Sequence, residues 1–600
     1  MKTILAPRIG SAMAGAAILL LMSVDAPPAL AQDAGARLHA LFDEEWEHRL
    51  RENPLFATSV GDHRFNDRLP AVSIADEARQ AEFDRRLLAR LKEIDPKALS
   101  EADRVSWEMF EWRLTDAIGG YEHKTYMLPL TADSGFHTEL ARLPENAPLA
   151  TAKDYENYIA RLNAIPRYME QWIALLREAR KAGYGLPRAV LDGYERSIAS
   201  QVVADPETSV FFKPFKEFPA SVPEADRGRL RTAGREAVAN GPIPGYRALL
   251  DYMTKEYIPG ARQTLGASEM PGGRALYAYL IRHFTTLDMT ADQVHELGLS
   301  EVKRIRAEMD AVIAKTGFSG DFAAFLEFLR TDPRFYPKTA EELLKQAAYL
   351  AKKMDGKLPL LFGRLPRQPY GVEAVPDDIA PKYTAGRYVG APLDSKRAGR
   401  YWVNTYALSS RSLYNLEALT LHEAVPGHHL QTSLAQERTG LHPFRRFTYV
   451  DAFGEGWGLY SEFLGREAGF YRDPYSNFGR LTYEMWRACR LVVDTGMHAM
   501  GWSRDRALQY LADNTALSRH EITTEIDRYI GWPGQALAYK TGELKIRELR
   551  RRAEQALGPR FDVREFHDAV LRNGSVPLSV LETQIDDYVA AAKAAAARGQ

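Results

Sequence analysis

The segment HEAVPGHH at residues 422–429 constrains this chain more than any other stretch of its 600 residues. It packs three histidines and a glutamate into eight positions, directly after the apolar run LEALTL at residues 416–421. Zinc hydrolases often carry the pattern H-E-x-x-H on a helix, with both histidines on the metal and the glutamate beside it as general base. This chain begins that pattern and then departs from it at Pro426.

The Pro-Gly pair inside the motif forbids a regular helix. Pro426 has no N–H and its ring clashes with an earlier carbonyl, so the helix must kink or widen, and Gly427 tolerates the dihedral angles that result. If the pair forms a two-residue bulge, His428 takes the place of the second ligand. On an ideal helix His429 lies nearly on the face of His422, but roughly 10 Å further along the axis. We predict His428 as the second ligand, with His429 as the alternative.

A third ligand is expected from the segment DAFGEGWGLYSE at residues 451–462. Glu455 has glycines on both sides, and small residues allow two helices to approach closely enough for a carboxylate to reach a metal on the neighbouring helix. We therefore predict Glu455 as the third ligand. Glu462 is the alternative ligand or a partner that orients an imidazole, and Asp451 could serve in the same supporting way.

Imidazole and carboxylate donors suit zinc best among the common divalent metals, so one Zn²⁺ ion is expected, with Glu423 as general base. A phenol is a good donor to an oxyanion, and Tyr539 and Tyr529 are the candidates. His498 lies one helical turn after Asp494 and either stabilises the oxyanion, binds substrate or is a core histidine. His567 is a further candidate for the same cleft.

A strand is predicted over GRYWVNTY at residues 399–406, just before the histidine motif, because β-branched and aromatic residues replace the helical pattern there. We expect residues 403–406, including Asn404, to line the cleft as an edge strand to which an extended peptide can add, or else to form a short structural hairpin.

The composition limits the partners and the compartment. A net charge of −1 gives no support for a nucleic-acid partner. The single cysteine, Cys489, allows no intrachain disulfide. Residues 1–31 have the pattern of a secretory signal: basic residues, an apolar stretch too short to span a bilayer, and a small-x-small site that predicts cleavage near Gln32. We predict a periplasmic or secreted protein without a stable membrane span in the mature chain.

Five motifs together resemble a known family. They are PLFATSVGD (54–62), HEAVPGHH (422–429), EGWGLY (455–460), PGQALAY (533–539) and FHD (566–568). They are similar to the bacterial domain-of-unknown-function family 885, over nearly the whole mature chain. The resemblance implies a large all-helical zinc peptidase, distantly similar to the angiotensin-converting-enzyme and thermostable carboxypeptidase groups. In those groups two histidines and a downstream glutamate hold zinc, which corresponds to His422, His428 or His429, and Glu455.

We therefore expect one mainly α-helical unit with two helical lobes around a deep cleft: residues 32–289 form the first lobe, and residues 290–600 form the second and carry the metal site. The predicted activity is zinc-dependent hydrolysis of a peptide or small amide. A hydrolase of non-peptide amides or esters and a zinc-stabilised binding protein without activity are the alternatives. The sequence leaves the oligomeric state open.

Overall fold

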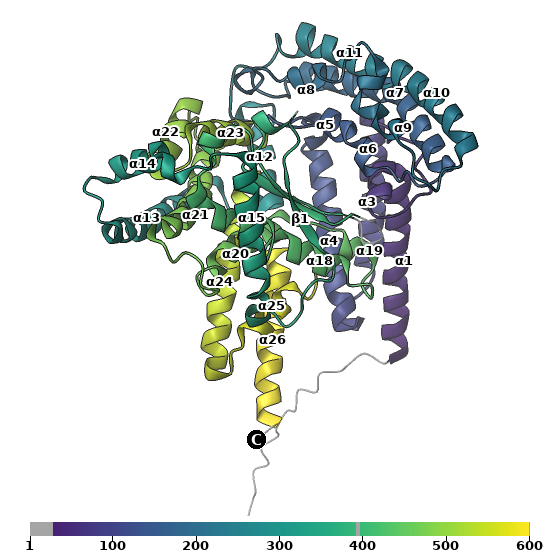
Figure 1. The fold of residues 1–600 in the computed structure, drawn as a ribbon. Helices are drawn as coiled ribbons and strands as arrows, with labels where there is room; N and C mark the ends of the chain where they lie inside the picture. The colour runs from purple at the N-terminus through teal and green to yellow at the C-terminus, as the bar shows by residue number, and fades with distance from the viewer. Residues whose placement is uncertain (1–27, 378, 392–396, 599–600) are drawn as a thin grey trace, which may run out of the picture.

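The protein is mainly α-helical with one small sheet, as predicted (Figure 1). The computed structural model describes residues 28–377, 379–391 and 397–598. Most of the predicted signal segment lies outside them. Within the described ranges, no helix combines the length and the apolar character needed to cross a membrane. The division into two lobes around a cleft stays a prediction.

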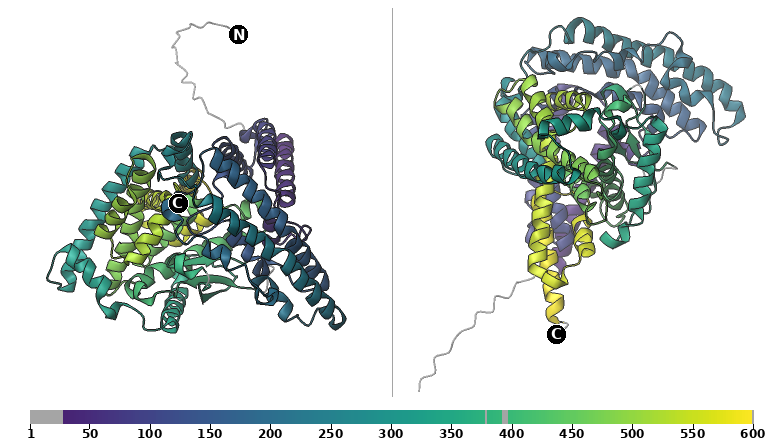
Figure 2. Two further views of the ribbon diagram at one scale, coloured as in Figure 1. Left: turned by 90° about the horizontal axis from the view of Figure 1, so that it is seen from above. Right: turned by 60° about the vertical axis from the view of Figure 1, so that its left-hand side comes forward.

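Helices account for most of the first half of the chain. They are α1 (Pro28–Glu52), α2 (Pro54–Ser59), α3 (Ile74–Lys92), α4 (Glu101–Glu122), α5 (Phe136–Ala141), α6 (Leu143–Asn146), α7 (Ala152–Lys181), α8 (Arg196–Ala199), α9 (Lys213–Lys216), α10 (Glu224–Asn240), α11 (Pro242–Tyr252) and α12 (Gly273–Thr285). Helices α10 and α11 both pack against α7 and form the layer at the top of Figure 1. Figure 2 shows the same layer from two other directions.

The second half carries the remaining helices. They are α13 (Ala291–Thr316), α14 (Phe322–Thr331), α15 (Ala340–Asp355), α16 (Leu358–Leu361), α17 (Leu416–Glu423), α18 (His428–Gln436), α19 (Pro443–Arg446), α20 (Asp451–Leu464), α21 (Pro474–Ala499), α22 (Arg504–Asn514), α23 (Arg519–Gly531), α24 (Ala538–Leu557), α25 (Val563–Leu571) and α26 (Leu578–Arg598). Helix α21 packs along α13, and α20 packs along α24 and against α17.

Local sequence signals set where several helices begin and end. The hydroxyl of Thr290 accepts a hydrogen bond from the Gln293 N–H, and the Gln293 side chain accepts one from the Thr290 N–H, which starts α13 with a capping box. Gly317, with φ of 70°, follows its last residue. Thr151 and Asp154 start α7 in the same way. These bonds satisfy N–H groups that have no partner within the helix.

The sheet has three strands in the order β1-β3-β2: β1 (Tyr370–Ala374), β2 (Gly386–Val389) and β3 (Gly399–Val403). Strand β3 pairs in parallel with β1 and antiparallel with β2. The predicted strand is therefore present over residues 399–403. It is the central strand, so the expectation that residues 403–406 form an edge strand at the cleft was wrong. Strands β1 and β2 are the two edges.

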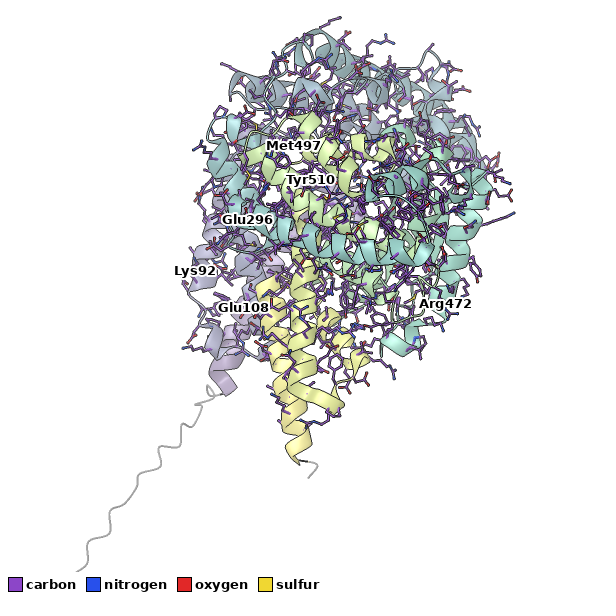
Figure 3. All side chains as sticks on the ribbon, turned by 90° about the vertical axis from the view of Figure 1, so that its left-hand side faces the viewer. Lys92, Glu108, Glu296, Arg472, Met497 and Tyr510 are labelled. Atoms are coloured by element: carbon purple, nitrogen blue, oxygen red, sulfur yellow. The ribbon has the colours of Figure 1, made fainter. Side chains whose placement is uncertain are left out.

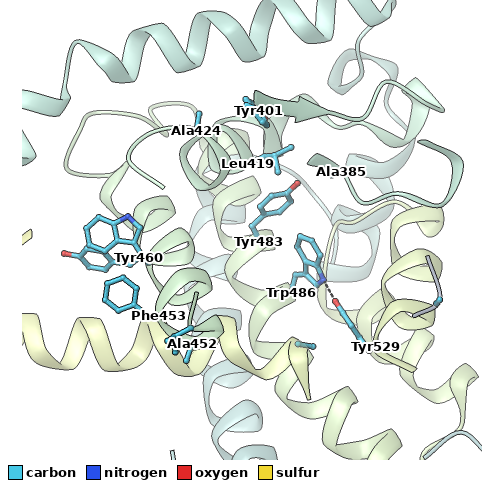
Figure 4. Packing of buried hydrophobic residues seen from close by; sticks show 14 of the residues in the cluster. Ala385, Tyr401, Leu419, Ala424, Ala452, Phe453, Tyr460, Tyr483, Trp486 and Tyr529 are labelled. Atoms are coloured by element: carbon cyan, nitrogen blue, oxygen red, sulfur yellow. Dashed lines mark hydrogen bonds between the residues drawn. The ribbon is translucent and has the colours of Figure 1, made fainter. Parts of the chain in front are cut away.

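Helix α21 runs through the centre of the second half and is buried from Phe478 to His498. Trp486 on this helix lies in the aromatic core that Figure 4 shows, where its indole N–H donates to the Tyr529 hydroxyl at 2.7 Å. In contrast, Glu296 and Arg472, labelled in Figure 3, are exposed on the outside of the molecule. The buried α21 thus forms a rigid support for the groups described next.

Candidate metal centre

The Pro-Gly pair breaks the histidine motif into two helices. Helix α17 ends at Glu423, and α18 begins at His428 after a turn that contains a cis peptide bond before Pro426. The backbone of Gly427 passes so close to His422 that an added Cβ would overlap the His422 carbonyl. Only glycine fits at this position, because there is no room for a side chain. The turn brings His428 back toward His422, as the bulge argument predicted.

Three side chains converge at this turn. The Oε2 atom of Glu455, from α20, lies 3.5 Å from His422 Nε2 and 3.3 Å from His428 Nε2. The two imidazole rings are 4.7 Å apart and nearly perpendicular. One potential ligand atom from each of the three residues lies within 4.8 Å of the other two. Two imidazoles and a carboxylate in this arrangement match the donor set of three-ligand zinc sites.

The polar atoms of the cluster fit a cation. Oε2 of Glu455 is buried and has no hydrogen-bond partner among the described residues. Burial opposes a charge on Glu455, yet His428 and His422 hold the pKa of its carboxyl well below the usual range. Burial likewise opposes a charge on His422, but the neighbouring carboxylates of Glu455 and Glu462 raise its pKa to about 10. The carboxylates thus favour positive charge between the rings, and a divalent metal would take the place of protons there.

Glu462 orients the first histidine. Its Oε1 lies 2.8 Å from His422 Nδ1, so a proton on Nδ1 is donated to the carboxylate and Nε2 is left facing Glu455. Arg487 of α21 holds the same Oε1 at 3.0 Å. Helix α20 can approach because Gly458 lies under the imidazole: a Cβ there would be 2.6 Å from the His422 ring. This is the role that sequence analysis considered for Glu462 as a partner of an imidazole, and its alternative role as a ligand finds no support in this geometry.

Glu423 lies beside the cluster at the end of α17, and it is almost fully buried. Its Oε2 accepts a hydrogen bond from the Tyr388 N–H of edge strand β2 at 2.7 Å. The group fits the place of a general base because it is held from one side and faces a cavity of about 420 Å³ on the other. The sheet therefore reaches the site through β2, and not through the strand that the sequence indicated.

The opposite wall of the cavity comes from Tyr539 and a group of arginines. The Tyr539 ring lies roughly parallel to the His422 ring, with centroids 6.2 Å apart, and its hydroxyl accepts a hydrogen bond from Arg528 at 3.2 Å. Four arginines line the cavity: Arg387, Arg487, Arg490 and Arg528. No sequence pattern predicted a role for them. The signal available was arginine at i, i+3 spacing inside the buried helix α21.

Asp451 also borders the cavity, one turn before Glu455 on α20. Burial raises the pKa of its carboxyl to about 6, and the nearby Glu455 carboxylate adds to this effect. Its supporting role toward a metal-binding imidazole stays a prediction.

His429 faces away from the cluster. Its Nδ1 lies 3.1 Å from the Tyr388 hydroxyl, and its ring packs 4.5 Å from that of Tyr370. Burial lowers its pKa to about 4. Among the described residues it is not part of the group of potential metal ligands. The alternative assignment of His429 as second ligand is therefore corrected, because α18 turns consecutive side chains to different faces.

Two further histidines are core residues. His498 accepts a hydrogen bond from the Ala267 N–H at 3.1 Å and donates to the Tyr529 carbonyl at 3.0 Å. His567 donates to the Leu361 carbonyl at 2.8 Å and accepts from the Tyr460 hydroxyl at 2.9 Å. Both ring nitrogens of each are occupied, which supports the core role considered for His498 and gives no support to a catalytic role for it or a cleft role for His567.

Tyr529 and Asn404 have structural roles as well. The Tyr529 hydroxyl accepts from Trp486 and from Arg490, both at 2.7 Å, and is buried away from the cavity. The Asn404 amide donates to the carbonyls of three residues between positions 380 and 384, at 2.9 to 3.1 Å, and so shapes the turn before β2. Their proposed contacts with substrate are corrected, because these bonds use their polar atoms.

Comparisons with other proteins agree with the sequence resemblance. A crystal structure of a suspected lipoprotein from Colwellia psychrerythraea matches with a TM-score of 0.85 and 26% identity, over 93% of this chain and 99% of that one. A suspected lipoprotein of unknown function from Shewanella oneidensis matches with a TM-score of 0.67 and 19% identity, over 92% and 99%, which shows a shared fold. No protein with a curated description matches the sequence.

The sequence profile of one family covers residues 54–585, which is most of the chain and includes every residue of the cluster. That family is described as a bacterial protein of unknown function, and its profile spans all five motifs on which the resemblance rests. The chain therefore belongs to the bacterial family DUF885.

Proposed function

We propose that this protein is a zinc-dependent hydrolase that cleaves peptide bonds. The observation that carries the proposal is the convergence of His422, His428 and Glu455 on one point beside Glu423, at the wall of a cavity. Bound zinc would supply a Lewis acid and lower the pKa of a water molecule. The cavity volume of about 420 Å³ suits a short segment of substrate.

Each of the surrounding side chains has a defined task in such a reaction. Glu423 accepts the proton of the attacking water, and its bond from the Tyr388 N–H fixes the carboxylate toward the cavity. The Tyr539 hydroxyl, which accepts its own hydrogen bond from Arg528, has a proton to donate to the oxyanion that forms on the substrate carbonyl. Glu462 keeps the His422 ring in the orientation and tautomer that a metal requires.

A structural zinc site is the second candidate. Structural sites usually have four protein ligands, whereas three converge here among the described residues and a cavity adjoins them. This favours an open, catalytic site. Removing the metal with a chelator separates the two: a structural site predicts a large fall in melting temperature, and a catalytic site predicts loss of hydrolysis with a smaller fall.

The test combines elemental analysis with a peptide-library assay read by mass spectrometry. We expect near-stoichiometric zinc in the wild type, the same zinc content but no hydrolysis in Glu423→Gln, and neither zinc nor hydrolysis in Glu455→Ala. His39→Ala, at an exposed histidine far along the chain, is the control and should behave as the wild type. A wild type that binds no zinc when zinc is supplied would refute the proposal. A wild type that cleaves only amides or esters outside the peptide library would restrict it to those substrates.

The envelope location is part of the same proposal. The two structural relatives are described as suspected lipoproteins, and the N-terminal segment has the pattern of a secretory signal. We expect the protein in the periplasmic or secreted fraction, with a mature N-terminus near Gln32. N-terminal sequencing of the protein recovered from that fraction tests this, and recovery in the cytoplasmic fraction with an intact N-terminus would contradict it.

A further inference from the structure

Three of the cavity arginines gather at one place although they come from three elements. Arg387 is on edge strand β2, Arg490 is on α21 and Arg528 is on α23. All three line the cavity that holds Glu423. Arg487, the fourth, is paired with Glu462 and belongs to the metal centre.

The carboxylate of Glu525 pairs with two of these arginines. Oε2 of Glu525 lies 2.9 Å from Arg490 and 3.3 Å from Arg528, and its Oε1 accepts a hydrogen bond from the Thr384 hydroxyl at 3.2 Å. Both oxygens of Glu525 are therefore in use. Burial opposes its charge, but Arg490 and Arg528 lower the pKa of its carboxyl to about 2, so Glu525 stays ionised at neutral pH.

The arginines keep unused donors. Nη1 of Arg490 is buried and has no hydrogen-bond partner among the described residues. Arg387 stacks on the Tyr383 ring at 5.0 Å, and no carboxylate of the described chain lies within 4.0 Å of its guanidinium. Burial opposes the charge of Arg387, but Tyr383 and Asp133 raise the pKa of its guanidinium above the usual value.

The charges do not balance. Arg490 and Arg528 are buried and share the single carboxylate of Glu525, and Arg387 has no carboxylate of the described chain at ion-pair distance. Burial of an unpaired cation is costly, and the cost is relieved when an anion enters. Arginine is also the side chain best suited to grip a carboxylate, because its planar fork can form two parallel hydrogen bonds. The cavity is thus prepared for a negatively charged group.

Tyr539 connects this place to the metal centre. Its ring faces that of His422, and the guanidinium carbon of Arg490 lies 4.1 Å from its ring centroid. Its hydroxyl contacts Arg528. Since Tyr539 lies next to both groups and an extended residue spans about 3.5 Å, an anion held by the arginines would lie within about three residues of the bond being cleaved.

We infer that Arg387, Arg490 and Arg528 form a subsite for a carboxylate of the substrate. That carboxylate is the C-terminus of a short peptide or the side chain of an Asp or Glu near the cleaved bond. The inference rests on the proposed hydrolase function, since it names the substrate that the same cavity takes.

Four peptide probes separate the two sources. N-acetyl-Ala-Ala-Ala is compared with its C-terminal amide, and N-acetyl-Ala-Ala-Glu amide is compared with the Gln analogue. A carboxylate held by charged hydrogen bonds should raise kcat/KM by about tenfold to hundredfold over its neutral counterpart. Preference in the first pair identifies the C-terminus, and preference in the second identifies the side chain. Equal rates within both pairs would overturn the inference and leave the peptidase proposal intact.

Arg387→Gln tests the subsite itself, because Arg387 is only half-buried and its loss should not unfold the chain. The preference, measured as the ratio of kcat/KM for a carboxylate peptide to kcat/KM for its neutral partner, should fall at least tenfold, mainly through KM. Arg387→Lys keeps the charge without the fork and should retain part of the preference. Arg274→Gln, an exposed arginine on α12, is the matched control. An unchanged preference in Arg387→Gln would refute the assignment.

Calorimetry with the same four probes covers the case in which nothing is hydrolysed. The expected result is that the wild type and Glu423→Gln bind a carboxylate peptide at least tenfold more tightly than its neutral partner, and Arg387→Gln does not. If that pattern holds without hydrolysis, the subsite stands and the proposed function falls. If no probe binds and none is cleaved, both are refuted.

Discussion

The metal centre and the core beside it use buried histidines in opposite ways. His422 and His428 turn one ring nitrogen each toward a carboxylate that is otherwise unsatisfied. His498 and His567 have both ring nitrogens bonded to backbone or hydroxyl groups. All four are buried or nearly so, so burial does not distinguish them. The comparison teaches that a histidine is available to a metal only when one ring nitrogen is left without a protein donor or acceptor of its own.

Burial also has opposite results in the two places. Carboxylates raise the pKa of His422 to about 10 despite its burial. Among the described residues no carboxylate lies within 4.0 Å of a ring nitrogen of His498 or His567, and burial lowers their pKa values to about 4 and about 3. The metal centre therefore favours a bound cation, whereas the core around His498 and His567 disfavours a positive charge. The following experiments test this difference, beginning with the largest effect on metal binding.

Adjacent histidines should differ most. His428→Ala is expected to abolish stoichiometric zinc, because it removes one of three converging donors. His429→Ala should keep zinc and lose about 1–3 kcal/mol of stability, since it deletes a buried ring and its contact with the Tyr388 hydroxyl. Elemental analysis and urea unfolding measure the two effects. The reverse pattern would show that His429 is the ligand.

Gly458→Ala should weaken zinc binding more than tenfold without removing a ligand. The added Cβ would lie 2.6 Å from the His422 ring and displace it from Glu455. Titration with a chromophoric chelator gives the affinity. Gly440→Ala is the control, because its Cβ would have nothing within 4 Å. Equal affinities for the two variants would contradict the close approach of α17 and α20.

Glu462→Gln should lower zinc affinity by about tenfold to hundredfold, the range typical of a partner that orients a metal-bound histidine. It also weakens the pairing with Arg487. Glu467→Gln offers a matched change at a carboxylate that pairs with Arg550 at 2.9 Å, outside the site. If both variants bind zinc as the wild type does, Glu462 has no orienting role.

The core histidines should affect pH dependence and leave zinc unchanged. Their pKa values are depressed in the folded state, so the unfolded chain binds more protons once the pH falls below about 6.5. Each contributes stability that is present above that pH and is lost by about 1.4 kcal/mol per pH unit as the pH falls toward 4. His498→Gln should flatten this slope in urea unfolding at pH 6.5, 5.5 and 4.5. An unchanged slope would mean that His498 is protonated in the fold.

Much of the site follows from local sequence. Pro426 and Gly427 end one helix and start another because proline cannot continue the hydrogen-bond ladder, and this predicted the return of His428. The glycines around Glu455 predicted that two helices approach closely. In the structure α20 approaches α17 at Gly458, which lies against the His422 ring. The resemblance of the five motifs to a helical family predicted a mainly helical chain, and local caps such as that of Thr290 begin its helices.

Other features depended on partners far along the chain. The sequence predicted that residues 403–406 form an edge strand. The strand order makes β3 the central strand instead and places β2 at the edge beside the site. It offered His498 and Tyr529 as site residues, whereas their polar atoms are bonded within the core. It gave no role to the three arginines from separate elements that line the cavity, two of which pair with Glu525.

The sequence by itself determined where helices begin, where the motif must bend and which residue types could hold a metal, because these depend on dihedral limits and on neighbours within a few positions. Only the tertiary structure decided which ring nitrogen stays free and which charges meet. The partner of His422 Nδ1 is Glu462, 40 residues later, and that of Tyr388 N–H is Glu423, 35 residues later. Such pairings depend on how helices and strands pack, and the periodic spacing of apolar residues in the sequence does not predict them.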